Sequence, residues 1–327
     1  MGNPAGPRKA YCTSCGELVD ADDRFCAYCG TELAHRERRA NECSQRQERY
    51  SSTRRSQDEY SPRRHRRRQR RQTPDSPLRA VGVAVGLAVT GMLSLTLVAV
   101  IGTLFGVLLR LPVVVALAIA ATVAHFLGFV GVAWVYLRHR GYDSEQQRSY
   151  IGLRRPTVRQ LGLVVAGNLV IVVLLAVLFG LVEMFSLLPA DEGTESVQDE
   201  LADLGVGAGV YLVLVVFMLA VVGPTEEVLY RGVIQNRLRE QFSVVPAIAI
   251  ASAVFTAIHL QIFLVGSGIL GVAVGFLALF IPSIVLGVVY EYTENIAVPS
   301  LVHGIHNSLI VTVLFFGPSF LADYITF

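Results

Sequence analysis

Long runs of hydrophobic residues alternate with short polar segments over most of the chain. A helix needs about 17 to 25 apolar residues to cross a bilayer, and runs of that length recur from residue 80 onward. We predict seven spans, at residues 80–109, 112–137, 159–186, 206–223, 246–264, 268–290 and 297–317. The pattern therefore predicts an all-α polytopic membrane protein with about seven transmembrane helices.

The first 78 residues have a different composition. They contain 17 Lys+Arg and 11 Asp+Glu, whereas the remaining residues carry a net charge of −4 within a chain total of +2. The sequence therefore predicts three parts: a zinc ribbon at 10–34, a disordered basic linker at 35–78 and a transmembrane domain at 79–327.

The zinc prediction rests on two Cys-x-x-Cys pairs, each followed by a glycine. Each pair can supply two thiolates from one tight turn, and zinc in structural sites takes four ligands. Two disulfides are the alternative, but so short a segment without a hydrophobic core favours a metal. The segment resembles the short zinc ribbons of many prokaryotic proteins, which implies a structural or partner-binding role for Cys12, Cys15, Cys26 and Cys29. Cys43 lies outside the motif and is expected to be a free thiol.

The linker at 35–78 is nearly free of aliphatic residues, so it cannot bury enough apolar surface to offset its ordering entropy. Its densest part, RRHRRRQRR at 63–71, holds seven arginines directly before the first predicted span. Nucleic-acid binding is one interpretation. A juxtamembrane polybasic segment that keeps the N-terminus in the cytoplasm and attracts anionic lipids is the favoured one.

The loops give an orientation. The loop at 138–159 is basic and the loop at 189–204 is acidic, so the positive-inside rule places the first in the cytoplasm and the second outside. We therefore expect a multi-pass protein of the cell membrane with a cytoplasmic N-terminus. Residues 226–240 should then lie toward the cytoplasmic side.

Ionisable groups next to membrane spans are costly and point to function. In GPTEEVLYRGVIQNRL, Glu227 and Arg231 are four residues apart, which predicts an ion pair on one helix face. Glu226 is displaced by about 140° from Arg231, so its carboxylate should be left for acid–base chemistry. A cluster of charges at a helix end is the structural alternative.

Two further spans carry polar groups. His259 lies late in the fifth predicted span, four residues after Phe255, and His303 and Asn307 are one turn apart in the last. A single histidine or asparagine in a membrane helix is more often a packing residue, as we expect for His125.

Taken together, Glu-Glu-x-x-x-Arg, Phe-x-x-x-His and His-x-x-x-Asn on three hydrophobic segments resemble the three motifs of the CPBP intramembrane protease family. That family includes CAAX prenyl proteases and bacteriocin-processing and immunity proteins. The resemblance covers roughly residues 155–320, and the zinc ribbon and linker lie outside it.

The resemblance implies an intramembrane endopeptidase. Glu226 and His259 would activate water, His303 and Asn307 would stabilise the oxyanion, and Glu227 and Arg231 would orient their surroundings. The family pattern leaves open a catalytic zinc on Glu226, His259 and His303, although metal-free Glu/His activation is favoured.

The substrate would be a membrane-associated peptide, whether prenylated, a leader or a membrane-bound regulator, and the ribbon would recruit a protein partner. A non-proteolytic scaffold or immunity protein of the same fold is the alternative function. A transporter is a third, weakened because the chain has no inverted repeat.

Overall fold

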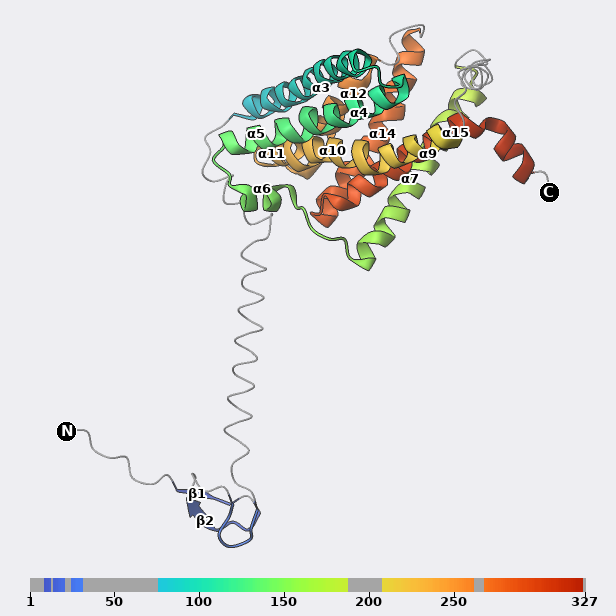
Figure 1. The fold of residues 1–327 in the computed structure, drawn as a ribbon. Coiled ribbons are helices and arrows are strands. Elements are labelled where there is room, and N and C mark those ends of the chain that lie inside the picture. The colour runs from blue at the N-terminus through green and yellow to red at the C-terminus, as the bar shows by residue number, and fades with distance from the viewer. Residues whose placement is uncertain are drawn as a thin grey trace. The chain divides into compact units, whose positions relative to one another are not determined.

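The computed structural model describes residues 9–12, 14–20, 25–31, 76–187, 208–261 and 268–325 (Figure 1). The chain divides into two units, Met1–Arg64 and His65–Phe327. Most of the predicted linker, the acidic loop at 189–204 and Cys43 lie outside the described residues.

The N-terminal unit contains a two-stranded antiparallel sheet. Strand β1 (Lys9–Tyr11) pairs with β2 (Leu18–Asp20), and Ala10 lies opposite Val19. The side chains of Cys12, Val19 and Cys26 form a small buried cluster beneath it. Because these few apolar groups bury little surface, the stability of a ribbon of this size depends on a cross-link or a metal.

The second unit is helical. It has six helices long and apolar enough to span a membrane among its described residues, together with a shorter apolar helix, Val244–His259. The prediction of an all-α polytopic membrane protein is confirmed. The elements are α3 (Pro77–Leu108), α4 (Val113–His125), η1 (Phe126–Gly131), α5 (Val132–His139), α6 (Ser144–Ile151), α7 (Val158–Met184), α9 (Ala208–Phe217), η2 (Met218–Val222), α10 (Gly223–Glu227), η3 (Val228–Gln235), α11 (Asn236–Arg239), α12 (Val244–His259), α14 (Ile269–Thr293) and α15 (Ala297–Ile325).

Two predicted spans differ from the observed helices. The fourth was expected at 206–223, but the helix continues to residue 239, through α10, η3 and α11. Pro224 has no N–H to donate, and the backbone accommodates it with a π-helical segment, η2, instead of ending. The fifth, predicted at 246–264, is the 16-residue α12, which ends at His259.

The continuous helix from α9 to α11 contributes to one of two apolar clusters. One cluster involves α3, η1, α5, η3 and α12, and the other involves α7, α14 and α15. Small residues allow close packing on α3: Ala80, Ala84 and Ala88 are buried in the first cluster, and Gly102 and Gly106 face α4, which runs beside α3 (Figure 1). The charged side chains of α10 and η3 are therefore enclosed by protein and not by lipid.

A second polar network anchors the end of this helix. The buried carboxylate of Glu240 accepts hydrogen bonds from both Arg140 Nη atoms at 2.7 and 3.2 Å, from Tyr150 at 2.9 Å and from Arg237 at 2.9 Å. Burial alone lowers the pKa of Arg140, but the hydrogen bonds and charge of Glu240 raise it above its ordinary value. The network ties α6 and the α5–α6 connection to the helix that carries the two glutamates.

Candidate functional site

Two glycines bring the glutamate helix against α15. A Cβ on Gly223 would lie 2.6 Å from the Ser300 carbonyl oxygen, and a Cβ on Gly304 would lie 2.9 Å from Leu219 Cα. Neither position has room for a side chain, so the two backbones approach more closely than larger residues allow. Gly304 follows His303 directly, and Gly223 is one turn before Glu227. The crossing therefore places the side chains of His303 and Glu227 together.

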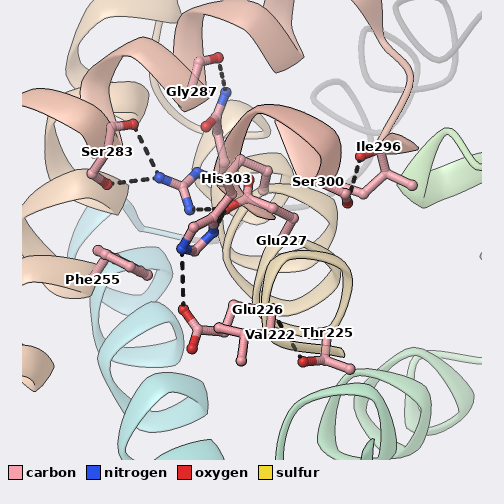
Figure 2. A network of polar contacts seen from close by, with 12 residues as sticks. Val222, Thr225, Glu226, Glu227, Phe255, Ser283, Gly287, Ile296, Ser300 and His303 are labelled. Carbon is pink, nitrogen blue, oxygen red and sulfur yellow. Dashed lines mark hydrogen bonds and ion pairs between the residues drawn. The ribbon is translucent and has the colours of Figure 1, made fainter. Parts of the chain in front are cut away.

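Glu227 and Arg231 form the ion pair predicted from their spacing. Arg231 Nη1 lies 2.6 Å from Glu227 Oε1, and both side chains are buried. Arg231 Nη2 also donates to the Ser283 carbonyl and hydroxyl oxygens at 3.0 and 2.7 Å, and the guanidinium lies 5.1 Å from the Phe255 ring centroid (Figure 2). A buried ion pair needs such additional hydrogen bonds, because desolvating both charges is costly.

His303 joins this pair from α15. Its Nδ1 lies 2.9 Å from Glu227 Oε1. Because Glu227 is paired with an arginine, its carboxylate is ionised and can only accept, so His303 Nδ1 carries the proton. In the neutral ring Nε2 is then an acceptor, and it faces Glu226 Oε2 at 3.9 Å (Figure 2).

His259, on α12, also lies close to Glu226. Its Nδ1 lies 2.8 Å from the Phe255 carbonyl oxygen, which can only accept, so this ring is also protonated at Nδ1. Its Nε2 lies 4.0 Å from Glu226 Oε2. Glu226 Oε2 therefore lies 4.0 and 3.9 Å from two imidazole nitrogens of the same tautomer, carried by α12 and α15. The His259 side chain is 17% exposed and that of Glu226 is 8% exposed, so the site is shielded but not sealed.

The spacing of these atoms distinguishes water from zinc. Two acceptors about 4 Å apart can each lie about 2.8 Å from one water oxygen, with an angle of about 90° there. A zinc ion about 2.0 to 2.2 Å from both would need an angle of about 150°, whereas tetrahedral zinc has about 109°. The donor types of Glu226, His259 and His303 suit zinc, and their tautomers do too. Their spacing does not.

The ribbon cysteines do have zinc geometry. The Sγ atoms of Cys12 and Cys29 are 3.6 Å apart, as are those of Cys15 and Cys26. Zinc–sulfur bonds of about 2.3 Å in a tetrahedron give sulfur separations of about 3.8 Å. Within the described ranges, these four residues are the cluster of potential metal ligands gathered within 4.8 Å, and all four are free thiols and not disulfides.

The two cysteine turns share one design. Gly16 and Gly30 have φ of 76° and 73°. Their backbone amides donate hydrogen bonds to the carbonyl oxygens of Cys12 and Cys26, each at 2.8 Å. Hydrogen bonds from the Thr31 side chain and amide lower the pKa of Cys29 to about 6. The Glu17 amide acts in the same direction on Cys15, but burial and neighbouring thiols raise its pKa to about 12. Four adjacent thiolates therefore need a cation to coexist.

Sequence reasoning found most of these groups but not all of their contacts. It placed Glu227 with Arg231 and separated Glu226 from that pair, and both placements are confirmed. It missed the hydrogen bond between Glu227 and His303, which are 76 residues apart. It also missed Ser283, for which the sequence has no signal beyond a neighbouring proline. Asn307 is half-buried one turn after His303 on α15.

These features define a class: a multi-span helical membrane protein with an enclosed Glu–His centre, as a membrane-embedded hydrolase requires. Residues 208–309 match the family described as type II CAAX prenyl endopeptidase Rce1-like, and residues 8–33 match the zinc-ribbon domain. The first match covers the segment that holds Glu226, His259 and His303, and it supports an intramembrane endopeptidase in general. The comparisons with curated proteins and with solved structures found no match.

Proposed function

We propose that the membrane unit is an endopeptidase that hydrolyses a peptide bond in a membrane-associated peptide near the cytoplasmic face of the cell membrane. The observation that carries this proposal is the closeness of Glu226 Oε2 to both His259 Nε2 and His303 Nε2, at 4.0 and 3.9 Å. All three atoms accept hydrogen bonds, and a bound water can donate its two protons to two of them. An arrangement of this kind has no structural need in a membrane helix bundle.

Water activation follows from these positions. Glu226 and His259 hold the water, and Glu226 takes its proton as the oxygen bonds to the scissile carbonyl carbon. Glu226 then gives that proton to the amide nitrogen while the carbon–nitrogen bond breaks. Because no protein atom forms a covalent bond with the substrate, the products are a free carboxylate and a free amine.

The remaining groups act on charge and orientation. Asn307 would donate from its amide to the oxyanion, and His303 can do so from Nε2 only when the ring is protonated at both nitrogens. Glu227 sits beside that ring and would stabilise such an imidazolium. Arg231 holds Glu227 in place, so these two residues set the orientation of His303 and take no proton from the water.

The remaining parts of the chain support a location and a partner. The arginine-rich sequence before α3 is consistent with a cytoplasmic N-terminus. The zinc ribbon contributes a folded module whose role would be to bind a protein partner or to position one. Substrate candidates are a prenylated C-terminus, a leader peptide and a membrane-bound regulator.

The test is peptide cleavage by purified protein in liposomes, with a pool of peptides that do or do not end in a prenylated cysteine. Mass spectrometry would identify the bond that is cut. Glu226→Gln should abolish cleavage, whereas Glu145→Gln, at an exposed carboxylate of α6, should not. Equal cleavage by Glu226→Gln and the unaltered chain would overturn the mechanism, and no cleavage by either would favour the scaffold alternative.

A further inference from the structure

The described groups around Glu226 offer few proton donors. His303 donates from Nδ1 to Glu227, and His259 donates from Nδ1 to the Phe255 carbonyl. Arg231 is engaged by Glu227 and Ser283. Peptide hydrolysis builds a negative charge on the carbonyl oxygen, and that charge needs hydrogen-bond donors that are already in place. Neutral imidazoles that present Nε2 as an acceptor do not supply them.

Tyr230 carries an uncommitted hydroxyl on the helix face of Glu226. It is four residues, about one helical turn, after Glu226, where α10 continues into the π-helical η3. Its side chain is fully buried, and its hydroxyl has no hydrogen-bond partner among the described residues. A buried hydroxyl without a partner costs free energy, so such a group calls for an explanation.

Aromatic contacts fix the ring of Tyr230 beside the site. Its centroid lies 4.9 Å from that of Phe255, edge to face, and 6.1 Å from that of Phe129. It lies 6.4 Å from the His259 ring. Phe255 in turn lies 4.4 Å from His259 and 6.0 Å from His303. The phenol therefore belongs to the same cluster as both imidazoles and has little freedom to turn away.

We propose that the Tyr230 hydroxyl donates a hydrogen bond to the scissile carbonyl oxygen as it becomes the oxyanion. The attacking water is the other conceivable acceptor, but a donor to its oxygen would make it a weaker nucleophile. The carbonyl oxygen gains charge during the reaction, so the same donor stabilises the transition state more than the substrate. This inference rests on the proposed peptidase function and adds Tyr230 to Asn307 as a second donor.

The decisive variant is Tyr230→Phe, which keeps the ring and removes only the hydroxyl. We expect kcat to fall about 100-fold with KM changed less than about threefold, the pattern for an interaction made in the transition state. The limbs of the pH–rate profile should stay where they are, because Glu226 and the imidazoles are untouched. The melting temperature in detergent should be unchanged or higher, since an unpaired hydroxyl is lost.

Tyr211→Phe is the matched control. Its hydroxyl is 3.1 Å from Thr312 Oγ1 on α15, so this variant loses a formed hydrogen bond and should melt about 2 to 4 °C lower with kcat unchanged. A Tyr230→Phe protein that melts lower by a similar amount has lost a structural bond, and the inference is then wrong. An unaltered kcat in Tyr230→Phe, with Glu226→Gln inactive, overturns the inference but leaves the peptidase function. No cleavage by the unaltered chain overturns both.

Discussion

His303 Nδ1 and Arg231 Nη1 donate to the same oxygen, Oε1 of Glu227, at 2.9 and 2.6 Å. Glu227 therefore accepts hydrogen bonds from two donors. Glu226, the residue before it, faces two acceptors. This difference separates the roles of two adjacent carboxylates. Glu227 fixes a histidine tautomer, and in the mechanism we propose Glu226 is the carboxylate that exchanges protons.

The first prediction concerns Glu227. Glu227→Gln leaves Arg231 buried without its counter-charge, so the free energy of unfolding should fall by about 3 to 5 kcal/mol. Denaturant unfolding of the purified protein measures this loss. Glu145→Gln, at an exposed carboxylate, should change stability by less than about 1 kcal/mol. Similar losses in the two variants would mean that the Glu227–Arg231 pair has no special structural weight.

The second prediction concerns the helix crossing at Gly304. Gly304→Ala would place a methyl group 2.9 Å from Leu219 Cα, on a rigid backbone, so α15 must move away from η2. We expect a loss of about 1 to 3 kcal/mol of stability and a larger proportional loss of cleavage, because His303 moves with the helix. Thermal melting and kcat would be measured together.

Gly86→Ala is the control for that prediction. Gly86 lies on α3, and nothing lies within 4 Å of a Cβ placed there. Alanine favours a helix over glycine by about 1 kcal/mol, so this variant should be as stable as the parent or slightly more so. If Gly304→Ala behaves in the same way, close approach of the two backbones is not what positions His303.

The sequence predicted interactions within one helix better than those between helices. The Glu227–Arg231 pair follows from a four-residue spacing, and the helical geometry near it fixes the angle between neighbouring side chains. Contacts of Glu227 with His303 and of Arg231 with Ser283 depend on how α10, η3, α14 and α15 pack. No local spacing encodes that packing.

The prediction of the fourth span shows the same limit. The fourth span was predicted to end at residue 223 because charged residues follow it, and charges in lipid are costly. The helix continues because the surrounding helices bury Glu226, Glu227 and Arg231, so lipid is not their solvent. The motif-based expectation that Glu226, His259 and His303 lie together is matched by the structure, while their catalytic roles, with that of Asn307, remain proposals.

The third prediction is a pH effect at Tyr150, which lies between spans and donates to Glu240. Burial, followed by the charge of Glu240, raises the pKa of Tyr150 well above its ordinary value of 10.0. The folded state then keeps a proton that the unfolded state loses, so this contribution to stability is complete below pH 10 and is lost as pH rises above it. The pH is raised from 8, about 2 units below the ordinary pKa, to 10.5, about half a unit above it. Over this range the parent should lose more stability than Tyr150→Phe.

The measurement for Tyr150 is the melting temperature at the two pH values. At pH 8 the variant should already be less stable than the parent by about 1.5 to 3 kcal/mol, since a hydrogen bond to a charged group is missing. The difference between parent and variant should therefore narrow as the solution becomes more alkaline. A constant difference across the range would mean that the Tyr150 proton is not linked to folding.

The last prediction separates two places where zinc could act. The ribbon sulfurs fit tetrahedral zinc, whereas the spacing of Glu226, His259 and His303 fits a bridging water. Purified protein should therefore contain about one zinc per chain by elemental analysis, and Cys12→Ser should remove it, because structural zinc needs its four ligands. Cleavage of a peptide substrate should persist in Cys12→Ser and in chelator-treated protein. If instead chelation stops cleavage in a Cys12→Ser protein that has lost the ribbon zinc, a metal acts at the membrane site, and the water-spacing argument is wrong.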